Sequence, residues 1–338
     1  MIGCNYTPGY AANQIEFWSA ETFDPATIDR ELGDAAALGF NAMRLYLHDL
    51  VHAADPQGLL DRIDRFLALA ARHGLGVIPV IFDSVWHPFP HPGHQREPEP
   101  GVHNAGWVQS PGLATLGDAA RFAALEGYVR SLIARFRDDA RVLLWDVWNE
   151  PDNANAGSYG ARDLGAAKAD IVRPLLALTF AWARSEQPSQ PLTTGVWAGH
   201  WDDASLTPLR RLQLDLSDIV SFHCYDDAAA MSVRIAELRR FGRPLLCTEY
   251  MARPRGSTFE AILPLLAREE IGAISWGLHR GRTQTHLAWD TWRAPCQGEP
   301  AAWFHDVLWP DGRPYRQAEA DLIRRIAAAH AGPQRSAT

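Results

Sequence analysis

Short apolar runs alternate along this chain with longer segments in which apolar residues recur every three or four positions. Nearly continuous apolar runs are typical of strands buried on both faces, and the longer period is typical of amphipathic helices. The runs that we interpret as strands are IGCNY, NAMRLYL, GVIPVIF, VLLWDVW, LTTGVW, IVSFHCY, PLLCTEY and GAISWGL. The pattern therefore predicts strands and helices in alternation.

The helical periodicity lies between and after these runs, and Gly39 follows the first such segment as a C-cap residue. The predicted helices cover residues 25–38, 59–73, 118–137, 160–185, 228–241, 258–270 and 317–329, with a shorter one near 207–214. Strand–helix repeats of this size are typical of a parallel (β/α)8 barrel. An open doubly wound sheet would instead need a Gly-rich phosphate turn, and neither GxGxxG nor GxxxxGK[ST] is present.

We therefore expect an α/β fold, namely a single-domain (β/α)8 TIM barrel over residues 1–332 with a C-terminal tail at 333–338. Two connections are too long to be plain turns: residues 84–117 after the third strand and residues 279–312 after the eighth. The carboxyl ends of barrel strands carry the active site, so long loops at these ends shape the access of a substrate.

Two predicted strands end in a glutamate. The stretch LLWDVWNEP, residues 143–151, places Glu150 after an apolar strand, and Pro151 stops the pairing because it has no N–H. The seventh strand, PLLCTEY, contains Glu249 near its end. Either glutamate alone could be a salt-bridged residue at the rim. Two carboxyl groups facing each other across the barrel mouth instead suit glycoside hydrolysis.

These residues resemble glycoside hydrolase clan A, most closely the cellulase-like family 5, over nearly the whole barrel from IGCNY to ISWGL. The most specific motif is WNEP at the end of the fourth strand. The resemblance implies that Glu150 is the acid/base, that Asn149 binds the sugar 2-hydroxyl, and that Glu249 is the nucleophile.

Other positions of the family pattern also have matches. The motif MRLYL supplies Arg44, which the resemblance places beside the nucleophile, and FHCY supplies the pair His223 and Tyr225. The motif ISWG supplies Trp276, which the resemblance places under the sugar in the first donor subsite. For the third-strand histidine of the family, the nearest residue is His87, which comes later than the pattern requires.

A retaining mechanism needs its two carboxyl groups about 5 Å apart and in opposite protonation states. Arg44 and a hydrogen bond from Tyr225 would favour the ionised form of Glu249. Aromatic surroundings such as Trp148, together with a nearby anion, would raise the pKa of Glu150. This chemistry needs no cofactor.

The tryptophans and one further carboxylate complete the candidates. Sugars stack their C–H faces on flat aromatic rings, so Trp86, Trp197 and Trp289 are candidate substrate contacts. About half of the loop tryptophans should instead be structural, drawn from the set Trp86, Trp107, Trp197, Trp201, Trp289, Trp292 and Trp303. We expect Trp145 and Trp182 in the core. Asp146 lies four residues before Glu150 on the same face of the strand, and we expect it to bond an arginine or a backbone donor.

Charge, cysteine content and hydropathy narrow the possible partners and the location of the protein. The net charge of −8 and a pI near 5.9 provide no basic surface for nucleic acid or anionic membranes. Cys4, Cys224 and Cys247 lie in apolar runs and Cys296 does not, and no CxxC spacing occurs, so buried reduced thiols are expected. No apolar run reaches the roughly 20 residues of a membrane span, and the first residues do not form a signal peptide. We therefore expect a cytoplasmic protein.

A metal site would have to use the histidines crowded into one loop. Their spacings match no zinc pattern, so we expect no metal; they are His87, His91, His94 and His103. The sequence thus favours a retaining β-glycosidase that acts on oligosaccharides or glycosides, and more readily from a chain end than within a polymer. An inactive sugar-binding barrel, a transglycosidase and a metal-dependent barrel enzyme remain the alternatives.

Overall fold

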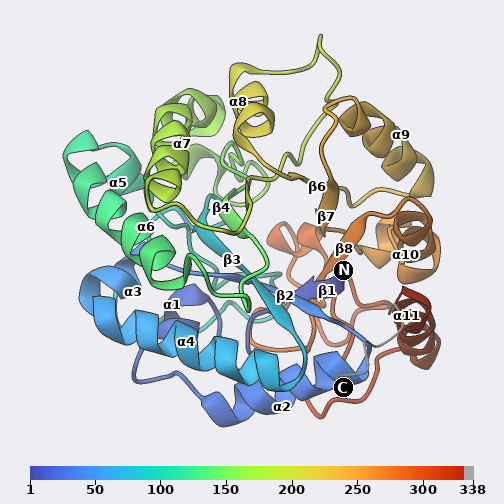
Figure 1. Ribbon diagram of the computed structural model, residues 1–338. Coiled ribbons are helices and arrows are strands. Elements are labelled where there is room, and N and C mark those ends of the chain that lie inside the picture. Colours follow the sequence, from blue (N-terminus) through green and yellow to red (C-terminus); the bar gives the residue numbers. More distant parts are fainter. Residues whose placement is uncertain (331–338) are drawn as a thin grey trace, which may run out of the picture.

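The computed structural model describes residues 1–330. Within them, eight parallel strands form a barrel ringed by helices (Figure 1), which confirms the predicted (β/α)8 fold. The strands are β1 Ile2–Asn5, β2 Ala42–Tyr46, β3 Gly76–Asp83, β4 Trp145–Asn149, β5 Leu192–Thr193, β6 Val220–His223, β7 Leu245–Glu249 and β8 Gly272–Trp276. The predicted tail at 333–338 lies outside the described residues.

The barrel closes between β5 and β6, where the structure departs from the expected strand at 192–197. Regular pairing in β5 ends at Thr193, and Val196 then forms an isolated parallel bridge with Phe222. The interruption has a local cause, because the Thr194 N–H donates to the Ser217 hydroxyl at 3.2 Å instead of to a neighbouring strand. A single bridge therefore completes the ring.

The helices that cover the barrel surround the strands (Figure 1). They are α2 Pro25–Ala37, α4 Pro56–Arg72, α6 Phe122–Phe136, α7 Lys168–Ser185, α8 Pro208–Leu216, α9 Ala228–Arg239, α10 Phe259–Arg268 and α11 Gln317–His330. Three short helices lie after β1, β2 and β3, and their length is below what periodicity detects: α1 Gln14–Trp18, α3 Asp49–Ala54 and α5 Leu113–Leu116.

The predicted helix at 160–185 was too long at its start. Its first residues form two 3-10 turns, Gly160–Arg162 and Gly165–Ala167, before α7 begins. Gly165 has a φ of 55°, which a right-handed helix cannot contain. The predicted helix at 118–137 likewise divides into a 3-10 turn, Ala119–Arg121, and α6.

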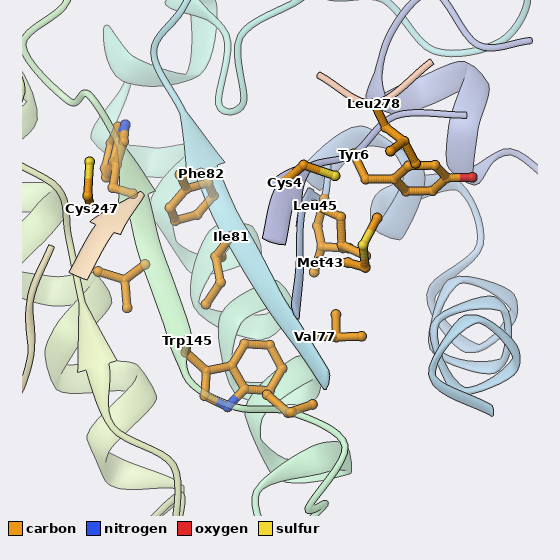
Figure 2. Packing of buried hydrophobic residues seen from close by; sticks show 14 of the residues in the cluster. Cys4, Tyr6, Met43, Leu45, Val77, Ile81, Phe82, Trp145, Cys247 and Leu278 are labelled. Carbon is orange, nitrogen blue, oxygen red and sulfur yellow. The ribbon is translucent and has the colours of Figure 1, made fainter. Parts of the chain in front are cut away.

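The main core fills the space between strands and helices. Figure 2 shows part of it, with Cys4, Met43, Phe82 and Trp145 packed among aliphatic side chains. Trp145 is fully buried as expected, whereas Trp182 is only half-buried against this core. The four cysteines are free thiols in the described chain, and the three in apolar runs are buried as predicted.

Inside the barrel, the lower layer is apolar and the layer above it is charged. The apolar layer consists of Ala42, Ile78, Leu144, Leu246 and Ile274. Two residues further along the chain from Ala42 and from Leu144, the interior positions are Arg44 and Asp146, both with 0% exposure. The apolar layer therefore excludes water from below a charged layer that supports the barrel mouth. Within residues 1–330, no helix is both long and apolar enough to cross a membrane.

Candidate active site

Glu150 follows the last residue of β4 in an unusual backbone conformation. Its φ is 44°, in the left-handed region that non-glycine residues adopt at a cost of about 1–3 kcal/mol. The next residue is Pro151, which has no N–H to continue the ladder. The chain therefore leaves the sheet at Glu150, a residue that is only 6% exposed and lines a cavity at the barrel mouth.

The partners of the Glu150 carboxyl are neutral. Oε2 accepts a hydrogen bond from Asn153 Nδ2 at 2.7 Å, and Oε1 lies 2.6 Å from His223 Nδ1. Burial lowers the pKa of His223 to about 4, so this ring is neutral near pH 7. Burial, with a contribution from Asp152, raises the pKa of Glu150 to about 7. Glu150 is therefore able to hold a proton near neutrality.

Glu249, the last residue of β7, has the opposite surroundings. Its Oε1 accepts from Arg44 Nη1 at 3.0 Å and from the Tyr46 hydroxyl at 2.9 Å. Its Oε2 accepts from the Tyr225 hydroxyl at 2.7 Å, the hydrogen bond expected from the sequence. Burial raises the pKa of Glu249 and Glu150 adds to this effect, while Arg44 and the hydrogen bond from Tyr225 act in the opposite direction. One cation and two hydroxyls bind this carboxylate, and they favour its ionised form.

A β-bulge between β6 and β7 places His223 opposite Glu249. Phe222 pairs with Cys247, but the next residue, His223, pairs with Glu249, so Thr248 is the extra residue. Bulges often redirect side chains beside active sites. Here His223 Nδ1 reaches Glu249 Oε2 at 3.5 Å as well as Glu150 Oε1. A carboxylate oxygen of Glu150 lies within 4.8 Å of one of Glu249.

Arg44 links the charged layer of the barrel to these groups. It binds Asp146 Oδ2 through Nε and Nη2, as expected for a structural carboxylate, and its Nη2 also donates to Asn149 Oδ1 at 2.7 Å. Asp146 and Asn149 are three residues apart and both reach Arg44, so the regular alternation of β4 is broken near Trp148. For this reason Trp148 does not line the cavity. Its indole packs on Phe82 and donates to the Ser84 hydroxyl, so the expectation that it surrounds Glu150 was wrong.

The cavity above the glutamates has a volume of about 300 Å³ and half-buried aromatic walls. Six of the residues expected to bind substrate line it: Trp86, Asn149, Trp197, Tyr225, Trp276 and Trp289. Trp292 also lines it and stacks on Trp86 with ring centroids 5.4 Å apart. The other loop tryptophans, Trp107, Trp201 and Trp303, are buried in the protein. Flat aromatic walls around two carboxyl groups suit a carbohydrate ring.

Three of the expected substrate-binding residues lie elsewhere. Arg44 is fully buried beneath the cavity, and His223 is 2% exposed between the two carboxyls, so both act through the glutamates. His87 lines a neighbouring cavity of about 530 Å³ whose walls include neither glutamate. Its ring contacts Tyr159 and Phe89. His87 lies four residues beyond β3, and the loop has by then left the barrel mouth.

The residue at the end of β3 is Asp83, which sequence reasoning missed. Its Oδ1 accepts from Asn149 Nδ2 at 3.0 Å and its Oδ2 from Trp107 Nε1 at 2.6 Å. Burial raises the pKa of Asp83 to about 7, and Glu150 adds to this effect. Tyr46 and Asn5 were also missed, although both end strands and contact Arg44. A carboxylate at the end of a buried strand was the signal that had identified Glu150 and Glu249.

One group of side chains in residues 1–330 has the ligand atoms of a metal site: Glu150, His223 and Glu249. The spacing of 2.6 Å between His223 Nδ1 and Glu150 Oε1 is that of a hydrogen bond. Two ligands of one tetrahedral zinc ion, each about 2.0–2.1 Å from it, would lie more than about 3 Å apart. The geometry as it stands therefore suits proton sharing better than metal ligation. The four crowded loop histidines form no such group in the described chain.

Comparisons with known proteins give structural relatives alone. No family model and no curated protein matches the sequence. The crystal structure of GH5_18 from Streptomyces cattleya in complex with GlcNAc has a TM-score of 0.63 at 17% identity, with 98% of this chain and 81% of that chain covered. An endo-1,4-β-D-mannanase from Thermotoga petrophila has a TM-score of 0.60 at 14% identity, with 97% and 99% covered.

A third similar structure is an exo-β-1,4-mannosidase from Opitutaceae bacterium strain TAV5. Its TM-score is 0.64 at 16% identity, with 97% of this chain and 59% of that chain covered. These structures share the barrel fold of this chain, and one of them is named as a member of GH5_18, within the family that the WNEP motif resembles. At such low identities they establish a shared barrel fold, and the chemistry has to be inferred from the site itself.

Proposed function

We propose that this protein is a retaining β-glycosidase in which Glu249 is the nucleophile and Glu150 is the general acid and base. The observation that carries the proposal is a pair of carboxyl groups in different environments, with an oxygen of one within 4.8 Å of an oxygen of the other. Retaining enzymes place these groups about 5–5.5 Å apart, whereas inverting enzymes leave room for a water molecule at about 6.5–9.5 Å.

The geometry supports a double displacement. An oxygen of Glu249 attacks the anomeric carbon while Glu150 gives its proton to the departing glycosidic oxygen. Esterification removes the negative charge of Glu249, which lowers the pKa of Glu150 and leaves it ionised. Glu150 then takes a proton from water, which attacks the anomeric carbon from the face that the leaving group vacated, and the bond to Glu249 breaks and restores its carboxylate. The product keeps the β configuration.

One further feature supports action at the end of a short β-linked chain. The loops at 84–117 and 279–312 are joined beside the cavity, since the Asn104 N–H donates to the Thr283 carbonyl at 2.8 Å and Trp86 stacks on Trp292. A joined wall restricts the passage of a polymer. The structural relatives named as mannosidase and mannanase make β-mannosides the first substrates to test.

The proposal is tested by turnover and stereochemistry. A panel of nitrophenyl β-glycosides and short oligosaccharides, with β-mannosides first, should identify a substrate. Proton NMR of the fresh reaction should show the β-anomer before mutarotation. An initial α-anomer would mean inversion and a different role for Glu249.

The same panel separates the alternative functions. Binding of a sugar without turnover would identify an inactive sugar-binding barrel, which the full set of acid, nucleophile and supporting arginine disfavours. Products longer than the substrate would identify a transglycosidase, in which a sugar replaces water at the second step.

A further inference from the structure

Asp83 has no part in the mechanism proposed above, yet it is a carboxylate at the barrel mouth with 1% exposure. It is the last residue of β3, where its backbone pairs with Asn149 at the end of β4. A buried carboxylate is costly unless donors satisfy it. Every hydrogen-bond partner of its side chain is a neutral donor; these are the Val85 N–H, Asn149 Nδ2, Trp107 Nε1 and Gln14 Nε2.

The contact with Asn149 settles which way that amide points. Asn149 Oδ1 accepts from Arg44 Nη2 at 2.7 Å, and Asn149 Nδ2 donates to Asp83 Oδ1 at 3.0 Å. In the reversed amide, the NH2 group would face the guanidinium and the carbonyl would face the carboxylate, so both contacts would become repulsive. Arg44 and Asp83 together therefore allow one orientation only. In that orientation Asn149 Nδ2 donates to Asp83 alone within the described residues, which leaves its second N–H without a protein acceptor, and Asn149 lines the cavity.

The same carboxylate also attaches the long loop at 84–117 to the site. Asp83 Oδ2 accepts from Trp107 Nε1 at 2.6 Å, and the Asp83 N–H and carbonyl both bond Ser110. The Trp107 ring in turn meets Tyr46 edge-on at 5.1 Å, beside Glu249. Asp83 thus connects Asn149, through Trp107 and Tyr46, to the side chains that hold Glu249.

We propose that Asp83 is a positioning residue that orients the Asn149 amide so that its free N–H meets the 2-hydroxyl of the sugar. This inference rests on the proposed glycosidase function. Hydrogen bonds to the 2-hydroxyl strengthen in the transition state of glycoside hydrolysis, so a misoriented amide lowers kcat more than it weakens substrate binding.

The test compares one aryl β-glycoside, chosen by the substrate panel, with its 2-deoxy counterpart. Asp83→Ala should lower kcat/KM on the parent glycoside by roughly ten- to a hundredfold, the scale of losing a hydrogen bond to a charged group. On the 2-deoxy substrate the loss should be under about threefold, because the Asn149 amide has nothing to bind there. Adding Asn149→Ala to Asp83→Ala should cost little more on either substrate, since the two residues act through one contact.

A second variant keeps the test decisive if Asp83→Ala does not fold. Asp83→Asn preserves the size of the side chain but can accept from only one of its two pairs of donors, so a smaller loss in the same direction is expected. Equal losses on the parent and 2-deoxy substrates, in a variant that melts cooperatively, would overturn the positioning role. A wild-type protein inert on every glycoside would instead refute the proposed function, so the two failures are distinguishable.

Discussion

The carboxyl ends of β4 and β7 present the same side chain in two different environments. Glu150 and Glu249 are both nearly inaccessible, at 6% and 4% exposure. Yet Glu249 binds a guanidinium and two hydroxyls, whereas Glu150 binds an amide and a neutral imidazole. Burial favours the protonated form of each; at Glu249 a bound guanidinium opposes it directly, whereas at Glu150 the hydrogen bond from Asn153 opposes it without a charge in contact. The comparison teaches that side chains from other strands, Arg44 of β2 and Tyr225 after β6, make the surroundings of the two glutamates different.

The largest effect is expected at the β7 end. Glu249→Ala should lower kcat by about 10⁴-fold or more, because removal of a catalytic nucleophile leaves only binding and residual stabilisation. Glu260→Ala, on the exposed side of α10, is the matched control and should keep full activity. Steady-state rates on the best aryl glycoside provide the measurement. Activity within tenfold of the wild type would exclude Glu249 as nucleophile.

Loss of Arg44 should destabilise the protein, because Arg44 is the cation that contacts Glu249 and not Glu150. Arg44→Met leaves Asp146 and Glu249 as buried carboxylates without their cation, which should cost about 3–5 kcal/mol of unfolding free energy. Arg72→Met is the control, because Arg72 is 60% exposed in its pair with Asp29 and should change stability by less than about 1 kcal/mol. Urea unfolding of both variants measures the difference. Equal stabilities would show that Arg44 does not support the site.

The β4 end should respond to the leaving group. Glu150→Ala should lose about 10²-fold or more on alkyl or sugar leaving groups, which need a proton from the general acid. A dinitrophenyl group departs unaided, so formation of the glycosyl-enzyme should be nearly unaffected. Azide needs no base and should restore the second step, with a β-glycosyl azide as product. Equal losses on both leaving groups without azide rescue would make Glu150 a structural residue.

A smaller effect should appear in the pH profile. The pKa of Glu150 is raised to about 7, so kcat/KM should fall as the pH rises through that value and the acid loses its proton. The Asp152 carboxylate contributes to the raised pKa, so Asp152→Asn should move this alkaline limb to lower pH. A profile unchanged by this substitution would show that burial alone raises the pKa behind the alkaline limb.

The sequence predicted the barrel and singled out both glutamates as candidates, because each depends on local features. An apolar run that ends in Glu150 or Glu249 can be recognised from the order of residues alone. Asp83 obeys the same rule but was missed, because the third strand was ended one residue too early. Tyr46 lies in the predicted second strand but was given no role, since nothing in MRLYL indicates that its hydroxyl reaches Glu249.

Loop residues were harder to place. His87 was chosen for its closeness in sequence to the third strand, yet its loop carries it to a different cavity. Trp292 and His305 line the site because two long loops fold against each other over many residues, and no periodic pattern encodes such a path. Their contribution depends on tertiary packing, which the order of polar and apolar residues does not specify.

The most direct measurement of the central claim is the identity of the residue that carries the glycosyl-enzyme. A 2-deoxy-2-fluoro glycoside with a good leaving group slows both steps and lets the covalent intermediate accumulate. Peptide mass spectrometry of the inactivated protein should find the fluorosugar on Glu249, and Glu249→Gln should remain unlabelled. A fluorosugar on Glu150, or on any other carboxylate, would contradict the assignment of the two strand ends.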